Sequence, residues 1–196
     1  MSTKNILKGE RVALNILQRM SGIANATYKM KKKLNNKNIK IIDTRKTTPN
    51  FRIFEKLAVK IGGGENHRMG LYDMILIKDN HIEANDGIEK TLRKLKNNSL
   101  KRKIKIEIEV KNLKQFETVQ NLGRNLVDIV MLDNFDIGKI IKAVINNKNN
   151  FLIELSGGIS LKNIEKYSKL KGIDYISSGS LTHSVNSTDI SLNFVT

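Results

Sequence analysis

Cysteine and tryptophan are absent from this 196-residue chain, proline occurs once, and aromatic residues make up only 5% of it. Without cysteine the chain can form neither disulfides nor thiolate metal sites, which is compatible with a cytoplasmic location. The scarcity of aromatic rings argues against a platform on which single-stranded nucleic acid could stack. No apolar run approaches the roughly 20 residues that cross a bilayer, and the first residues lack the apolar core of a signal peptide. We therefore expect a cytoplasmic protein without a membrane partner.

Positive charge is abundant, because 35 lysines and arginines stand against 19 acidic residues and give a formal net charge of +16. Such an excess is typical of proteins that bind nucleic acid or phosphates. Lysine and asparagine are frequent throughout, however, including probable loops at 35–38 and 146–150. We interpret most of the excess as solvated surface charge. With 39% hydrophobic residues, residues 1–196 are expected to form one globular domain, in which residues 1–7 are disordered or partly ordered.

Apolar periodicity predicts alternating helices and strands. Apolar residues at three- and four-residue spacing predict a long first helix from Glu10 to about Leu34, with lysines at the C-terminal end favoured by the helix dipole. Six short apolar runs predict strands, at 39–42, 74–77, 104–110, 126–132, 151–155 and 173–176. Helical patterns lie between most of them, at 51–61, 113–122, 137–145 and 161–170. This alternation predicts parallel βα units.

Six such units fit either an open doubly wound sheet or a barrel. No G-x-G-x-x-G fingerprint follows the first strand, as a dinucleotide-binding sheet would have. Polar residues recur at the C-terminal end of nearly every strand, where barrels build their sites. We therefore predict an incomplete α/β barrel of parallel strands with outer helices.

The segment Asp43–Pro49 follows the first predicted strand and gathers an acid, hydroxyls, a guanidinium and an ammonium. Because Arg45 offers a planar fork to a carboxylate or phosphate and Lys46 a compact charge beside it, we interpret the segment as an anion cradle that includes Thr44. His67 and Arg68 follow three glycines at the same end of the predicted barrel, and Lys78 ends the second strand. These residues extend the cationic group.

The last two predicted strands end in turns with the chemistry of a phosphate site. Ser156–Gly158 is followed by a helix expected to start near Ser160, and Ser177–Ser180 is followed by His183. Glycines let the backbone approach an anion, and N–H groups at a helix start point at it. Either turn alone could be a simple connection. Two in succession favour phosphate binding.

Glu109 and Asp133 are carboxylates at the ends of separate strands. Facing one barrel mouth, they could hold Mg²⁺ or stabilise positive charge that develops on a substrate. A structural ion pair with Lys46 or Lys78 is the alternative, and both interpretations can hold together. The three histidines, at 67, 81 and 183, show no zinc-type spacing, so we exclude zinc. No nucleophile elbow appears either, which leaves covalent acyl chemistry without support.

The ordered set of motifs resembles the quinolinate phosphoribosyltransferases, the carboxylating nicotinate-nucleotide pyrophosphorylases. The resemblance runs from about Leu7 to Phe194, and it rests on the segments 10–15, 21–24, 43–49, 62–68, 76–81, 107–110, 131–135, 156–159 and 181–184. It implies an open-faced, TIM-like barrel that joins quinolinate to phosphoribosyl pyrophosphate with Mg²⁺. The products are nicotinate mononucleotide, pyrophosphate and CO₂, a step in NAD biosynthesis.

The resemblance also implies residue roles. Thr44, Arg45, His67 and Arg68 bind quinolinate, while Lys46 and Lys78 lie between the two substrates and take part in catalysis. Glu109 and Asp133 address the ribose and Mg²⁺, directly or indirectly. The remaining phosphoribosyl pyrophosphate contacts are Ser156, Gly157, Gly158, Gly179 and His183.

The chain departs from the family pattern in length. Family members carry an N-terminal α/β sandwich domain, which caps the barrel of the dimer partner and supplies an arginine to the quinolinate pocket. We expect that domain to be absent here, which impairs activity. Its loss also leaves an apolar face that promotes association. The expected assemblies are a homodimer, a larger homo-oligomer or a complex with a separate N-terminal domain chain. Smaller departures are Asn50, Ser178 and Ser180.

Two other functions remain open at this stage. A related phosphoribosyltransferase barrel could act on another substrate, because the partner arginine is missing. A non-catalytic basic protein could bind RNA or DNA, although the grouping of charges at strand ends argues against it.

Overall fold

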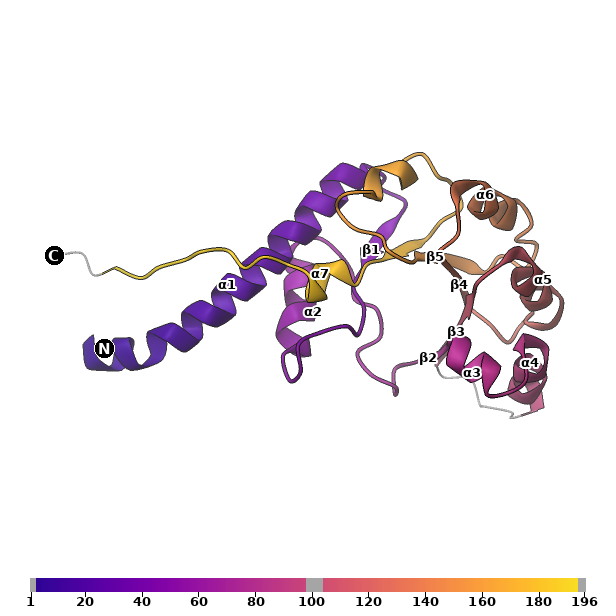
Figure 1. The fold of residues 1–196 in the computed structure, drawn as a ribbon, viewed down its shortest axis with the longest axis horizontal. Coiled ribbons are helices and arrows are strands. Elements are labelled where there is room, and N and C mark those ends of the chain that lie inside the picture. The colour runs from indigo at the N-terminus through magenta and orange to yellow at the C-terminus, as the bar shows by residue number, and fades with distance from the viewer. Residues whose placement is uncertain (1–2, 98–103, 194–196) are drawn as a thin grey trace.

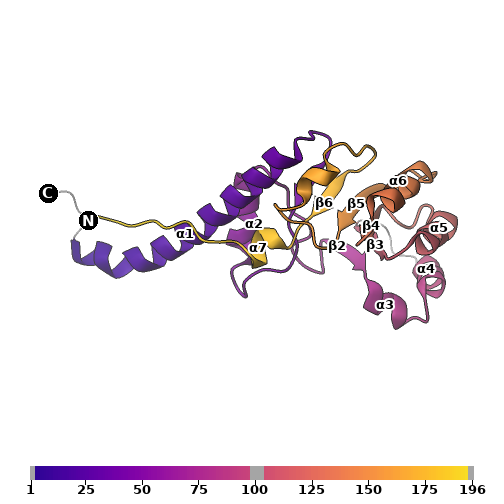
Figure 2. The same cartoon turned by 45° about the horizontal axis from the view of Figure 1, so that its top comes forward.

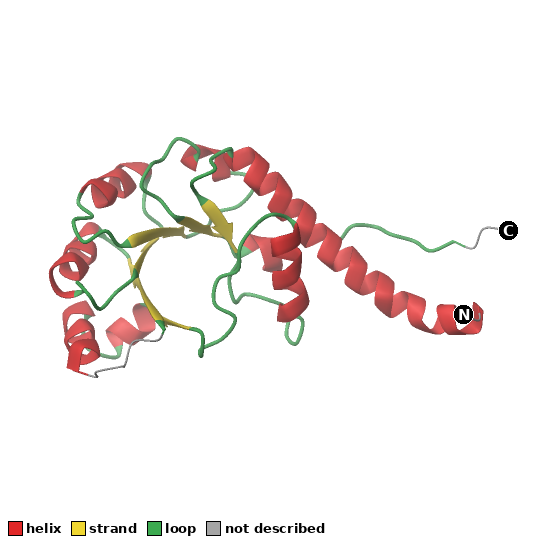
Figure 3. Cartoon of the chain, turned by 180° about the vertical axis from the view of Figure 1, so that it is seen from behind, coloured by secondary structure: helices red, strands yellow, loops and turns green. Residues whose placement is uncertain are grey.

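A computed structural model describes residues 3–97 and 104–193. Six parallel strands form one sheet in the order β1-β6-β5-β4-β3-β2. The strands are β1 (Lys40–Ile42), β2 (Met74–Ile77), β3 (Lys105–Val110), β4 (Ile129–Asp133), β5 (Leu152–Ser156) and β6 (Tyr175–Ser177). The sheet curves like a barrel but stays open, with β1 and β2 at its two ends (Figure 3). The predicted open-faced barrel is confirmed.

The longer helices cover the outer, convex side of the sheet, and short helices follow β2 and β6 at the carboxyl ends of these strands (Figure 3). They are α1 (Thr3–Leu34), α2 (Arg52–Ile61), α3 (Asp79–Glu83), α4 (Ile88–Asn97), α5 (Leu113–Leu122), α6 (Ile137–Ile145) and α7 (Ser180–His183), with a short 3₁₀ helix, η1, at Ile164–Tyr167. No helix within the described ranges has both the length and the apolar character needed to cross a bilayer.

The core lies between the sheet and these helices. Side chains alternate along each strand, so Ile108, Val130 and Ile153 are fully buried on the outer side, where they pack under the helices. The residues between them, such as Glu109 and Met131, face the inner, concave side. Since the inner side has no covering layer of helices, polar side chains are free to gather there.

The long helix α1 runs out from the body of the molecule, and the C-terminal segment returns along it (Figures 1 and 2). Gln18 joins the two, because its side chain donates to the carbonyl of Ile190 and its carbonyl accepts from the N–H of Thr188. The predicted helix start at Glu10 is wrong, since α1 already begins at Thr3. Of residues 1–7, which we expected to be disordered or partly ordered, residues 3–7 are therefore helical, and residues 1–2 lie outside the described ranges.

Two further helix predictions differ from the structure. The helix predicted over 161–170 is wrong, because only the four residues of η1 are helical there. Asn36 on the loop after α1 donates to the carbonyls of Ser168 and Leu170, which ties this segment to the end of α1. Helix α4 was not predicted, since five of its ten residues are charged and only three are apolar. The short helices α3 and α7 were not predicted either.

Candidate active site

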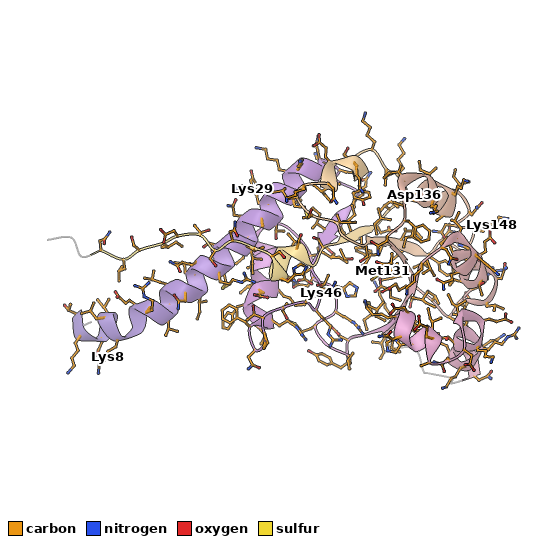
Figure 4. All side chains as sticks on the ribbon, viewed as in Figure 1. Lys8, Lys29, Lys46, Met131, Asp136 and Lys148 are labelled. Carbon is orange, nitrogen blue, oxygen red and sulfur yellow. The ribbon has the colours of Figure 1, made fainter. Side chains whose placement is uncertain are left out.

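A pocket of about 800 Å³ opens at the carboxyl ends of the strands. It gathers every site residue predicted from the sequence, namely Thr44, Arg45, Lys46, His67, Arg68, Lys78, Glu109, Asp133, Ser156, Gly157, Gly158, Gly179 and His183. It is also lined by Met131 and Glu154, which were not predicted. Figure 4 labels Lys46 and Met131 in the middle of the molecule, far from Lys8 at the start of α1. The loop after β1 and the loops after β5 and β6 thus share one cavity.

Asp43 braces the cationic wall of this pocket. Its carboxylate is fully buried and pairs with Lys56 of α2, and it also accepts from the side chain of Asn66 and from the N–H of His67. One acid therefore fixes both the loop after β1 and the loop that carries His67 and Arg68. The interpretation of Asp43 as part of an exposed anion cradle is wrong, because its oxygens are used internally.

Within the described part of the chain, neither of the two arginines of the pocket has a carboxylate at ion-pair distance. Among the described residues, no hydrogen-bond acceptor reaches the buried Nε of Arg45. Arg68 donates one guanidinium N–H to the carbonyl of Met74, at 3.2 Å. Burial, followed by the positive charge of Arg45, lowers the pKa of Arg68. Two neighbouring guanidinium groups held in this way are suited to a ligand that carries carboxylates.

Glu109 and Asp133 end adjacent strands on the inner face. Lys78 Nζ lies 3.1 Å from Glu109 Oε2, so the ion pair considered from the sequence is present. Asp133 accepts from the side chain of the neighbouring Asn134 at 2.8 Å and is only half-buried. Two carboxylates facing one cavity form an oxygen donor set of the kind that Mg²⁺ prefers. The residues present therefore fit that ion.

His67 lies at the floor of the pocket, where its Nδ1 is hydrogen-bonded and its Nε2 faces two acids. Its Nδ1 accepts the backbone N–H of Arg68 at 2.7 Å, which places the ring hydrogen on Nε2. That Nε2 lies 2.9 Å from Glu107 Oε2 and 3.5 Å from Glu154 Oε2, although neither contact is aligned as a hydrogen bond. Burial lowers the pKa of His67, which favours the neutral ring. His67 therefore faces two buried acids.

Glu107 and Glu154 form a buried acid pair beneath the cavity. Burial raises the pKa of Glu107 to about 7 and raises that of Glu154 well above its ordinary value, with the neighbouring charge of Glu107 adding to the second shift. The ligand atoms of His67, Glu107 and Glu154 lie within 4.8 Å of one another, so they could in principle hold a cation. Spacing rules could not reveal this group, because its members come from three separate segments. An acid at an inward position of an apolar strand is the signal that could have found Glu154.

The turn after β5 is shaped by its glycines. Gly157 and Gly158 have φ values of +100° and +58°, and a Cβ atom at Gly157 would collide with Asn134. No helix begins at Ser160, whose N–H instead donates to the side chain of Asn163 at 2.9 Å. The expectation that a helix start helps to bind phosphate at this turn is therefore wrong, although its open backbone still lines the pocket.

The turn after β6 leads into α7, and its extra hydroxyls are used within the protein. Ser178 donates to the carbonyl of Ile159 at 2.6 Å, and its hydroxyl lies 2.8 Å from that of Ser180. His183 reaches back over Gly179, where an added Cβ would touch its ring. His81 does not line the pocket, because it accepts the backbone N–H of Lys78 and caps α3. Only two of the three histidines therefore belong to the site.

Comparison with known proteins decides the family. The family model described as "Quinolinate phosphoribosyl transferase, C-terminal domain" matches residues 23–193. The chain belongs to this family. The resemblance seen in the sequence is thus confirmed. The pocket described above is that of a quinolinate phosphoribosyltransferase domain.

Relatives and solved structures agree with this assignment. The chain is 43% identical to a probable carboxylating nicotinate-nucleotide pyrophosphorylase of Bacillus subtilis, over 96% of this chain and 63% of that protein. It is 45% identical to the corresponding protein of Methanocaldococcus jannaschii, over 98% and 69% of the two chains. Crystal structures titled NadC from Streptococcus pyogenes and NadC deletion mutant match with TM-scores of 0.88 and 0.90, at 43% and 44% identity, and each match covers 96% of this chain and 65% of the other. The chain therefore spans about two thirds of the length of these relatives.

Proposed function

We propose that this chain forms the phosphoribosyl-transferring barrel of a quinolinate phosphoribosyltransferase. The reaction joins quinolinate to phosphoribosyl pyrophosphate and releases pyrophosphate and CO₂, leaving nicotinate mononucleotide for NAD biosynthesis. The observation that carries the proposal is the shared pocket, whose lining combines Arg45 and Arg68, the glycine turns after β5 and β6, and the carboxylates of Glu109 and Asp133. That arrangement suits a dicarboxylate and a phosphorylated sugar held side by side.

Positioning is the first task of the proposed site. Arg45 and Arg68, with Thr44 and His67 beside them, hold the quinolinate carboxylates, which orients the pyridine nitrogen toward C1 of the ribose. His67 contributes chiefly by ordering Arg68, since its Nδ1 already accepts the N–H of that residue. At the opposite wall, the 5′-phosphate lies against the two turns, where Ser156, Gly157, Gly158, Gly179 and His183 surround it.

Charge stabilisation is the second task. As the nitrogen attacks, the bond from C1 to pyrophosphate breaks and the ribose acquires oxocarbenium-like positive charge, which Glu109 and Asp133 stabilise. Lys46 and Lys78 offset the negative charge of the leaving pyrophosphate. Mg²⁺, held by Glu109 and Asp133 directly or through water, would add a positive charge at the pyrophosphate. The pyridinium then accepts the electron pair as the C2 carboxylate leaves, and a proton takes its place.

Partners and location complete the proposal. We propose a homodimer or larger homo-oligomer, or a complex with a separate N-terminal domain chain, and the exposed apolar residues Ile53, Leu57 and Ile61 of α2 support such a contact. The cysteine-free sequence supports a cytoplasmic location. A tobacco relative is named mitochondrial, so fractionation of cells that express the protein is the direct measurement.

The test is formation of nicotinate mononucleotide from quinolinate, phosphoribosyl pyrophosphate and Mg²⁺, with the chain alone and with an added N-terminal domain. We expect little turnover alone and more with the added domain, and Lys78→Ala should lower it by at least tenfold. Nicotinate in place of quinolinate should give no product, because the two arginines select a dicarboxylate. Equal turnover of nicotinate, or no binding of phosphoribosyl pyrophosphate by the folded chain in calorimetry, contradicts the proposal.

A further inference from the structure

Glu154 is the one acid of the pocket lining with almost no exposure to water, at 1%. It stands in the middle of β5, in register with Met131 of β4 and Tyr175 of β6. Both of its strand neighbours, Ile153 and Leu155, point to the core on the other side of the sheet. The carboxyl group of Glu154 is therefore aimed at the floor of the cavity.

One oxygen of this carboxyl group accepts no hydrogen bond from the described residues. Oε2 faces His67 Nε2 at 3.5 Å, whereas Oε1 is buried and receives no hydrogen bond from a donor among the described residues, although Ser177 and Glu107 interact with this carboxyl group. A buried polar atom without a partner is costly, so such atoms are rare unless a ligand completes them. Since Glu154 lines the pocket, a bound molecule can reach this oxygen.

The surroundings favour a proton on Glu154 over a metal ion beside it. Burial and the charge of Glu107 both raise the pKa of Glu154. A cation among Glu154, Glu107 and His67 would feel the positive charges of Lys56 and Arg68, which already act on the His67 ring. A neutral carboxylic acid avoids that repulsion and adds a hydrogen-bond donor. A donor in the pocket floor is the natural partner of an anionic ligand group.

We propose that Glu154 is a further substrate-contacting residue, whose neutral carboxyl group donates a hydrogen bond to a carboxylate of the pyridine dicarboxylate held by Arg45 and Arg68. The inference rests on the proposed function and adds a specificity-determining residue to it. A carboxylate so bound meets guanidinium groups on one side and an O–H donor on the other. An ionised Glu154 would instead repel it, so the buried acid pair and the arginines act together.

Quinolinate binding measured by calorimetry in EDTA tests this, with Glu154→Gln and Glu154→Leu as a size-matched pair. The glutamine variant keeps an N–H donor and should bind quinolinate within about threefold of the unsubstituted protein. The leucine variant has no donor and should bind at least about tenfold more weakly, the loss expected for a hydrogen bond to a charged group. Glu117→Gln, on the exposed side of α5, should change nothing.

Binding of phosphoribosyl pyrophosphate with Mg²⁺ distinguishes failure of this inference from failure of the proposed function. It should stay within about twofold in all variants, because the phosphate turns do not involve Glu154.

Leucine and glutamine variants that both bind quinolinate like the unsubstituted protein would overturn the inference. Quinolinate binding that needs a divalent cation in the unsubstituted protein, and that no longer responds to the cation in Glu154→Leu, would also overturn it, by making Glu154 a metal ligand. If the leucine variant does not fold, Glu154→Ala replaces it. Normal phosphoribosyl pyrophosphate binding without any quinolinate binding by the unsubstituted protein overturns the proposed substrate, and this inference with it.

Discussion

At the scale of single residues, the ion pair between Asp43 and Lys56 is removed from water almost completely, with side-chain exposures of 0% and 1%. Burial raises the pKa of Asp43 and lowers that of Lys56, so desolvation opposes both charges even though each favours the other. Asp43→Asn leaves the lysine ammonium buried without its counter-charge. We expect the free energy of unfolding to fall by about 3 kcal/mol or more, measured by urea denaturation.

Glu65 provides the matched comparison for this pair. Its carboxylate pairs with Lys40 at 3.0 Å, but both side chains are about half exposed. Water replaces such a contact easily, so Glu65→Gln should change the free energy of unfolding far less than Asp43→Asn. Equal losses for the two variants would show that burial is not what makes Asp43 important.

The proton on Glu107 should make stability depend on pH. Burial raises its pKa from 4.5 to about 7 in the folded protein, so the native state keeps a proton that the unfolded chain releases between these values. The contribution of this group to the free energy of unfolding is therefore complete below pH 4.5 and lost as the pH rises to about 7. Glu107→Gln imitates the protonated form at every pH.

Urea denaturation between pH 4.5 and 8 measures this effect. The unsubstituted protein should match Glu107→Gln most closely at the acid end and become less stable relative to it as the pH rises. Glu117→Gln, at an exposed position of α5, should run parallel to the unsubstituted protein. Parallel curves for Glu107→Gln as well would mean that Glu107 holds no proton that the unfolded chain releases.

At the scale of elements, the sequence predicts what depends on periodicity. Helices α5 and α6 have the predicted ends, and strand β2 has the predicted residues, because their apolar spacing and the Asn112 and Asp136 caps agree. The segment 161–170 shows the opposite case. Its apolar spacing suits a helix, but Asn163 closes a turn onto Ser160 and Gly158. Local hydrogen bonds between a side chain and the backbone leave no mark in the periodicity.

In the candidate site, the location of the residues could be predicted from the sequence, but their contacts could not. Carboxyl ends of parallel strands meet at one edge, so all the predicted residues reach one pocket. What could not be predicted is the use of each side chain. Asp43 looked like part of the anion cradle, yet it pairs with Lys56, which lies 13 residues further along the chain. Glu154 looked like part of an apolar strand, yet it faces the cavity. Both outcomes depend on which groups the fold brings together.

At the scale of the whole molecule, α2 carries an apolar stripe that the chain itself does not cover. Ile53, Leu57 and Ile61 recur every four residues and are 69%, 48% and 67% exposed. Helix α2 lies beside α1 (Figure 1), on which Val12 and Leu17 are also exposed. Exposed apolar side chains that recur along one helix form a surface that water disfavours. A surface of this kind is typical of a protein contact.

The stripe on α2 should therefore make the isolated chain associate with itself. Light scattering should show a mass that rises with concentration, and Leu57→Glu should shift the protein toward the monomer because it places a charge within the contact. Ile145→Glu is the matched control, since Ile145 is 75% exposed on α6 and lies outside the stripe. A monomer at high concentration, or an equal shift with Ile145→Glu, contradicts the prediction. Because association would cover α2 and leave the pocket at the strand ends open, Leu57→Glu should not weaken the binding of phosphoribosyl pyrophosphate to the chain.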